Sequence, residues 1–185
     1  KLDMANPLLP KYTVGVVTRD TMLLEFSSTI LCLILAGKVG SNIASEIGTM
    51  RITEQIDAME IMGVNSANYL ILPKITAFML MMPTLVIFSV GAALIGGYCM
   101  AAWGGILTVD EYVYGITYAF MTHHVPYAIV KSVIYAFVIT SVSAYYGYSA
   151  HGGALEVGKA STNAVVKSIV VILFLDIFLT KLMLS

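Results

Sequence analysis

The sequence predicts an all-α integral membrane protein, and its composition, its hydropathy and its long apolar stretches are the observations behind this. Of the 185 residues, 58% are hydrophobic and only 11% are charged, and the mean hydropathy is +0.87. Soluble domains carry about 25% charged and about 45–50% apolar residues. A chain so poor in charge cannot cover a core with a wetted surface, so lipid must be part of its solvent.

Four stretches are long enough to cross a bilayer, which needs about 20 mostly apolar residues. The first is expected to insert least easily because it contains Arg19, Asp20 and Glu25, whereas the second and fourth are the most clearly apolar. The approximate bounds of the four predicted spans are 13–35, 75–102, 126–148 and 165–183.

The segment 40–68, between the first two spans, differs from its neighbours and predicts one or two amphipathic helices outside the lipid. Gly48 is a candidate joint within it, and Gly63 a candidate stop. Apolar residues recur at helical spacing in two runs, which are Ile43, Ile47 and Met50, then Ile52, Ile56 and Met59.

The placement of Lys and Arg predicts the orientation of the chain in the membrane. Segments 37–74 and 149–164 carry basic residues and are expected in the cytoplasm. Segment 103–125 carries none and is expected outside. Three further lysines would lie outside and run against the rule, namely Lys1, Lys11 and Lys181.

Several functional classes are excluded by composition and spacing. The net charge of −1 provides no basic field for nucleic acid. Cys32 and Cys99 lie in apolar runs, without the spacing of a disulfide framework or a zinc site. Lys1 opens a polar, Pro-containing stretch rather than a signal peptide, and because the chain does not begin with Met we expect material to be missing upstream.

Residues 153–159, GALEVGK, nearly match a phosphate-binding loop. Ala160 stands where that loop needs Ser or Thr to hold magnesium, and no α/β domain surrounds the segment. We therefore expect no nucleotide site in this chain. If its function needs ATP, another chain must bind it.

Charged residues inside the predicted spans are costly in lipid and need partners. Lys131 and Asp176 are expected at similar depth in the outer half of the membrane, which predicts that they pair, either to hold two spans together or to line a polar pocket. Glu25 lies near mid-membrane, and Arg19 is more than a turn away. A bound headgroup, a protonated Glu25 or a second subunit therefore stay open for it.

The segment 36–64, AGKVGSNIASEIGTMRITEQIDAMEIMGV, carries a long and specific resemblance to a known family. It resembles the MlaE family of permeases, which partner ABC ATPases and MCE-domain proteins in bacterial lipid transport. The similarity continues through Leu72-Pro-Lys74 into the second span. Weaker similarity extends through Lys131-Ser-Val and Gly147-Tyr148 to Leu175-Asp176, so it covers nearly the whole chain.

This resemblance implies a homodimeric, multi-pass permease of the bacterial inner membrane that carries phospholipid. Two ATPase subunits would bind ATP and Mg beneath it, and MCE proteins would form a ring on its periplasmic side. The chain itself would have no catalytic residue, metal or cofactor. Residues 1–185 would form a single permease domain without the interfacial helix and first span that the family places ahead of four further spans. The family usually has Arg directly before the position of Glu25, where this chain has Leu24.

The resemblance also implies roles for particular residues. The amphipathic segment would be the coupling helix that docks on the ATPase, with Glu46, Arg51, Glu54, Asp57 and Glu60 as its charged residues. In the lipid pocket Glu25 would meet the headgroup region, and the apolar residues that would contact acyl chains are Leu23, Phe26, Ile30 and Leu33. The same apolar residues would equally suit packing against neighbouring helices.

Three functions are compatible with the sequence. The first is a permease that alternates its access under the control of ATP binding in another subunit. The second is a proton-coupled secondary carrier that uses Glu25, Lys131 and Asp176 as a relay. The third is a membrane assembly factor that transports nothing.

Overall fold

The computed structural model describes residues 10–104, 108–121 and 123–184, and every regular element in these ranges is a helix. The polar stretch that opens with Lys1 lies outside the described residues. Five successive helical segments join without a break into one long rod from Thr13 to Ile52. These segments are α1 Thr13–Thr21, the π-helical η2 Met22–Ile30, α2 Leu31–Leu35, the π-helical η3 Ala36–Gly40 and α3 Ser41–Ile52.

The remaining described helices are all shorter than this rod. A second rod, Ala67–Gly104, joins the π-helical η4 Ala67–Ile71 to α5 Leu72–Gly104. The other elements are α4 Gln55–Ile61, α6 Val109–Thr117, α7 His124–Tyr148 and α8 Ala154–Leu184.

Three of the described helices are long and apolar enough to cross a membrane, namely Thr13–Ile52, Ala67–Gly104 and His124–Tyr148. They contain the first three predicted spans. The predicted fourth span, 165–183, lies inside α8, so its helical structure is confirmed while its membrane crossing stays a prediction.

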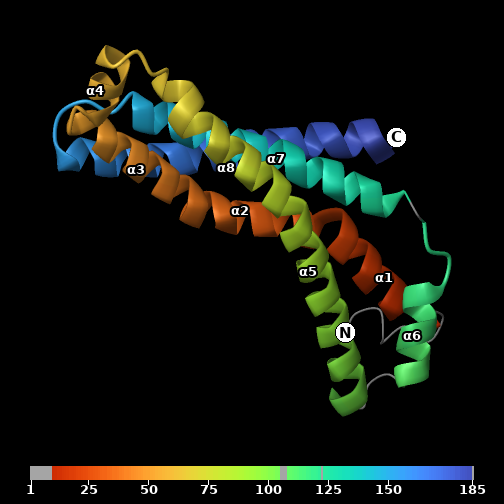
Figure 1. Ribbon diagram of the computed structural model, residues 1–185. Helices are drawn as coiled ribbons and strands as arrows, with labels where there is room; N and C mark the ends of the chain where they lie inside the picture. Colours follow the sequence, from red (N-terminus) through yellow and green to blue (C-terminus); the bar gives the residue numbers. More distant parts are fainter. Residues whose placement is uncertain (1–9, 105–107, 122, 185) are drawn as a thin grey trace.

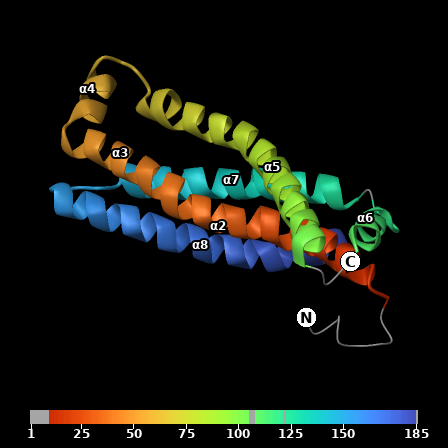
Figure 2. The same cartoon turned by 90° about the horizontal axis from the view of Figure 1, so that it is seen from below.

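Helices α3, α7 and α8 pack against one another along one bundle, and α5 packs on α7. Figures 1 and 2 show α5 leaving this bundle along its second half and approaching α6. Pro83 lies inside α5 and removes one backbone donor, which permits a helix to change direction. Helix α4 lies at one end of the bundle, and α1 and α6 lie at the other (Figure 1).

The first helix does not end near residue 35, and Gly48 is not a joint. Gly48 lies within α3, where an added Cβ would approach Val157 of α8 to 3.1 Å, so it permits close packing rather than a turn. The chain turns instead at Thr53 and Glu54, and Glu54 adopts a left-handed φ of 61°. The segment predicted to lie apart from the first span therefore begins as its direct continuation.

The predicted stop at Gly63 is confirmed. Gly63 has a φ of +78°, a conformation that glycine adopts without steric cost. Its N–H bonds to Glu60 O, and the next N–H, from Val64, bonds to Met59 O. This pair of bonds is the Schellman pattern that satisfies the last carbonyls of a helix.

Most of the side chains in the interior of the bundle are apolar, and so are many on its surface. Large side chains such as Leu80, Phe88 and Phe174 point outward, which suits a surface in contact with lipid. The main core joins the first rod, α5, α7 and α8 through Cys32, Ala36, Met82, Tyr135, Ala136, Ile139, Ile172 and Leu179.

Gly147 lies at a close contact between α7 and α3, because an added Cβ would lie 2.7 Å from Ala44 O and 3.0 Å from Ile47 Cβ. We expect Gly147→Val to cost about 1–3 kcal/mol of stability through overpacking. Thermal denaturation of the detergent-purified protein measures this as a lowered Tm. Gly91→Val is the matched control, because a Cβ there meets nothing within 4 Å. A Gly147→Val variant as stable as the control would contradict the tight packing.

Candidate functional site

Three charged side chains from three helices meet inside the bundle. Lys131 of α7 places its Nζ 2.6 Å from Asp176 Oδ1 of α8. The same nitrogen lies 3.1 Å from both carboxylate oxygens of Glu25 in η2 and donates to Leu24 O at 3.2 Å. Lys131, Asp176 and Glu25 together form what we call the charged network.

Hydroxyl groups complete the hydrogen bonding of the two carboxylates. Tyr135 Oη donates to Asp176 Oδ1 at 2.7 Å. Thr29 Oγ1 lies 3.1 Å from both Asp176 Oδ1 and Glu25 Oε2. Thr180 Oγ1 lies 3.4 Å from Glu25 Oε1. Buried charges are tolerated only when their remaining hydrogen-bonding positions are also satisfied, as they are around this lysine.

The three members of the charged network differ in exposure. The Lys131 side chain is 0% exposed, that of Asp176 is 21% exposed and that of Glu25 is 40% exposed. The cation is therefore enclosed, while Glu25 lies at the open edge. With both carboxylates ionised the network carries an excess negative charge, and this charge lies toward the accessible side.

Helical geometry places these side chains together. Tyr127, Lys131 and Tyr135 recur at every fourth position of α7 and share one face of that helix. The Lys131 ammonium lies 5.1 Å from the Tyr127 ring centre and 6.0 Å from that of Tyr135, which is favourable for a cation. In η2, Thr29 follows Glu25 by four residues, a spacing at which side chains share one helix face, and its Oγ1 lies 3.1 Å from Glu25 Oε2.

Sequence reasoning paired Lys131 with Asp176 but did not consider Lys131 as a partner for Glu25. The three partners left open for Glu25 were a headgroup, a proton and a second subunit, and the structure supplies a partner from the same chain. The tyrosines on either side of Lys131 and the Glu25–Thr29 spacing were signals for a larger polar cluster.

Arg19 lies apart from the charged network. Its guanidinium donates to Ile116 O at 2.9 Å, Tyr118 O at 2.8 Å and Asp20 Oδ1 at 2.8 Å. It is buried at the end of the bundle where α1 meets α6. Arg19 therefore holds α6 against α1 instead of pairing with Glu25.

The residues predicted to contact acyl chains do not share one pocket. Leu23 is buried and lines an apolar cavity of ≈ 170 Å³ with residues of α5 and α7. Phe26 and Ile30 point outward, on the exposed face of the first rod. Leu33 packs against the main core. Only Phe26 and Ile30 lie on a surface that a lipid or a second chain can reach directly.

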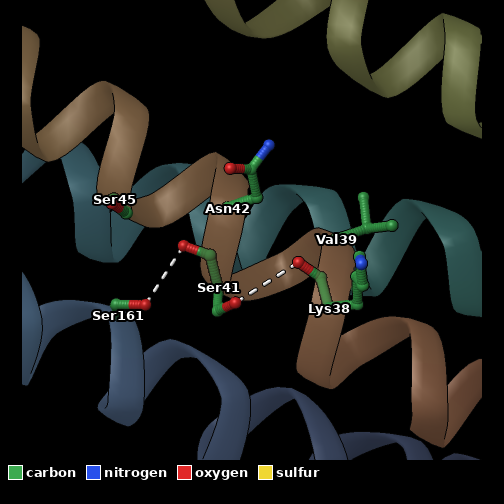
Figure 3. Close-up of a pocket in the computed structure, with 6 residues that line it drawn as sticks. All are labelled: Lys38, Val39, Ser41, Asn42, Ser45 and Ser161. Atoms are coloured by element: carbon green, nitrogen blue, oxygen red, sulfur yellow. Dashed lines mark hydrogen bonds between the residues drawn. The ribbon is translucent and has the colours of Figure 1, made fainter.

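That exposed face continues from Ile34 toward a polar hollow of ≈ 590 Å³ at the junction of η3, α3 and α8. Figure 3 shows Ser161 of α8 facing Ser41, whose backbone oxygen accepts its hydrogen bond at 3.1 Å. The lining residues are Lys38, Val39, Ser41, Asn42, Ser45 and Ser161. Sequence reasoning did not single out this hollow, because its serines come from segments far apart in the chain.

The predicted coupling residues lie near the end of the bundle that carries α4. Glu46 forms an ion pair with Lys74 at 2.7 Å, and Arg51 pairs with Asp57 at 2.5 Å. Glu54 is exposed at the turn before α4. These contacts connect α3 to α4 and to the start of α5.

Glu60 has a different set of partners. Its Oε1 accepts hydrogen bonds from Tyr148 Oη at 2.7 Å and from Ser66 Oγ at 3.0 Å. The hydrogen bond from Tyr148, followed by that from Ser66, lowers the pKa of the Glu60 carboxyl below its usual value, and the Arg51 charge lowers it further. Glu60 is therefore ionised at neutral pH.

The end of α4 presents an apolar tip. Ile61 is 87% exposed and Met62 is 71% exposed, and Val64 beyond them is also exposed. Exposed apolar residues at the end of a polar loop are a common signature of a protein contact.

Comparison with known proteins identifies the family of this chain. The family described as "Permease MlaE" matches residues 3–182. A probable ABC transporter permease protein of Rickettsia bellii is 35% identical over 158 residues, which cover 85% of this chain and 61% of that protein. The chain therefore spans about three fifths of that relative's length.

Other organisms contain similar proteins. A probable ABC transporter permease protein of Synechocystis is 30% identical over 92% of this chain and 65% of its own length. The chloroplastic protein TRIGALACTOSYLDIACYLGLYCEROL 1 of Arabidopsis thaliana is 33% identical over 85% of this chain and 45% of its own length. Together with the apolar helices described above, these matches show that the chain is a multi-pass membrane protein and belongs to the MlaE permease family.

Proposed function

We propose that this chain is the membrane permease subunit of an ATP-driven transporter that moves phospholipid between the bacterial inner membrane and periplasmic MCE-domain proteins. The observation that carries the proposal is a charged network that opens onto an apolar helix face. Glu25 lies at the accessible edge of the network, and Phe26 and Ile30 are exposed beside it on the same rod.

A surface of this kind suits an amphiphile. The amine of a zwitterionic headgroup such as phosphatidylethanolamine is matched by the exposed carboxylate of Glu25, and acyl chains are matched by the exposed apolar side chains of the rod. The name of the Arabidopsis relative contains the name of a diacylglycerol lipid, which supports lipid as the class of cargo.

The energy source in this proposal is a separate ABC ATPase, which would bind ATP and Mg. The relatives named ABC transporter permeases support an ATP-driven mechanism over a proton-coupled carrier. The apolar tip of α4, formed by Ile61 and Met62, is the surface we assign to the ATPase contact, with the charged residues of segment 40–68 around it.

The remaining parts of the proposal concern the membrane arrangement. We assign residues 165–183 of α8 as the fourth span, because this stretch of 19 residues is mostly apolar and contains three charged residues, Lys167, Asp176 and Lys181. A second copy of the chain packs on the exposed face of the rod Thr13–Ile52, so that the network and the polar hollow of Figure 3 lie near the dimer seam. ATP binding would draw the two α4 helices together and change the access of lipid to this seam.

Reconstitution with the partner ATPase tests the proposed function directly. We expect ATP-dependent transfer of fluorescent phospholipid out of vesicles that contain the complex. Native mass spectrometry of the complex should give two copies of this chain, two ATPase subunits and retained phospholipid. A lone chain without ATPase or lipid, under conditions that keep a known ABC complex intact, would contradict the proposal.

Substitutions in the charged network separate folding from transport. Lys131→Met leaves two carboxylates without their cation, so we expect a loss of about 3–5 kcal/mol of stability. Glu25→Gln leaves the Lys131–Asp176 pair in place, so the variant should keep a near wild-type Tm but transfer lipid roughly tenfold more slowly, as expected from one lost charged hydrogen bond.

The control for this pair is Glu156→Gln, which neutralises an exposed carboxylate that pairs with Lys159 outside the network. It should change neither Tm nor transport. Wild-type transport by the Glu25→Gln variant would remove Glu25 from the headgroup site.

The apolar tip of α4 provides a test of the ATPase contact. Met62→Asp places a charge on the proposed contact. We expect the affinity for the ATPase, measured by co-purification, to fall at least about tenfold. Leu155→Asp is the control, since Leu155 is also exposed and lies in the other predicted cytoplasmic segment. Equal ATPase binding by the two variants would place the contact elsewhere.

A further inference from the structure

We propose that Tyr148 is a positioning residue that makes α4 and α7 move as one unit, so that a displacement of α4 reaches the charged network inside the membrane. This inference deepens the proposed function and rests on it. The contacts involved come from α3, α4, the start of η4 and the last residue of α7. We call Arg51, Glu60, Ser66 and Tyr148 the loop clasp.

The hydrogen bonds of the loop clasp converge on one oxygen. Glu60 Oε1 accepts from Tyr148 Oη at 2.7 Å and from Ser66 Oγ at 3.0 Å, and the two hydroxyl oxygens lie 3.1 Å apart. Hydrogen bonds to an ionised carboxylate are shorter and stronger than neutral ones. Glu60 therefore links α4 both to α7 and to the beginning of the second rod.

The Tyr148 ring has further contacts with a cation and with an apolar cluster. The Arg51 guanidinium carbon lies 5.3 Å from the ring centre, while Arg51 itself pairs with Asp57 of α4. The ring packs against a second apolar cluster, whose buried members are Ile43, Ile47, Ile56 and Ala144. Stacking and packing fix the ring, so its hydroxyl has a defined direction toward Glu60.

Helix α4 has few other attachments. Ile56 is its buried residue, and it is flanked by the left-handed turn at Glu54 and by Gly63, so both of its connections are turns. Within the described ranges, the bond from Tyr148 to Glu60 is the hydrogen bond that joins α4 to α7. Removal of the Tyr148 hydroxyl would thus let α4 tilt while α7 stays in place.

Helix α7 connects this clasp to the charged network. It runs unbroken from His124 to Tyr148 and contains Lys131, about 25 Å from Tyr148 at ~1.5 Å per residue. Because Lys131 is fully buried and contacts Asp176 of α8 at 2.6 Å, a small shift of α7 changes the ammonium–carboxylate distances directly. The clasp and the network are two ends of the same rigid element.

The test uses this permease in complex with its ABC ATPase, reconstituted in vesicles of phosphatidylethanolamine and phosphatidylglycerol with a trace of fluorescent phospholipid. Tyr148→Phe removes the hydroxyl but keeps the ring that packs and stacks. We expect complex assembly and ATP hydrolysis to be retained, while lipid moved per ATP falls about tenfold, the factor expected for one lost hydrogen bond to a charged group.

Two further variants show whether the effect passes through Glu60. Glu60→Gln keeps a hydrogen-bond acceptor for Tyr148 and should lose less coupling than Tyr148→Phe. The double variant should be no worse than Tyr148→Phe alone, because both changes act on one contact. Tyr145→Phe is the control, since Tyr145 is exposed one turn away on the same helix. It should leave lipid moved per ATP unchanged.

A distance measurement tests the inference without an assay of lipid transport. Spin labels at the exposed positions Ala58 of α4 and Phe137 of α7 report the separation of the two helices by electron resonance. In the otherwise wild-type complex this distance should stay constant when the ATPase is trapped with vanadate, and in Tyr148→Phe it should change.

The outcomes are distinct. In the Tyr148→Phe variant, an unchanged lipid-to-ATP ratio overturns the role of Tyr148. A spin-label distance that stays unchanged on trapping in that variant also overturns it. An equal fall of ATP hydrolysis and transport would mean that the residue only supports assembly, which also overturns it. A wild-type complex that moves no lipid contradicts the proposed function, and the spin-label distances then decide the coupling on their own.

Discussion

The burial of Lys131 is the constraint on which much of this structure depends. An enclosed ammonium in an apolar bundle is tolerated only with anionic partners, and here Asp176 and Glu25 supply them from two other helices. The first rod, α7 and α8 must therefore keep one register relative to one another. The apolar packing around Tyr135 and Ile139 fills the space about this contact, but apolar packing alone would allow the helices to slide or rotate.

The fold was largely predictable because hydropathy reports long apolar helices directly. The bounds of the third span and the stop at Gly63 follow from local chemistry that the sequence displays. The continuity of the first rod does not, because Gly40 and Gly48 are typical both of breaks and of close helix packing. The structure assigns them to packing against Ser143 and Val157, and a single sequence does not contain that information about neighbouring helices.

The candidate site was predictable in composition but not in geometry. The depth of each residue along its predicted span placed Lys131 near Asp176. Glu25 reaches the same lysine from η2, a π-helical segment that has no clear sequence signal. The different surroundings of the apolar residues near Glu25 could not be predicted for a related reason. In a membrane helix, lipid-facing and core-facing positions are both apolar, so Phe26 and Leu33 look alike in sequence while they face different surroundings.

The unbroken first rod has a mechanical consequence. It contains 40 residues and is therefore about 60 Å long at ~1.5 Å per residue, longer than the hydrocarbon core is thick. Arg19 fixes one end to α6, and Arg51 contacts α4 and Tyr148 near the other. A tilt of about 5° about Glu25 would displace Ile52, about 40 Å away along the helix, by about 3.5 Å, and Thr13, about 18 Å away, by about 1.6 Å in the opposite direction.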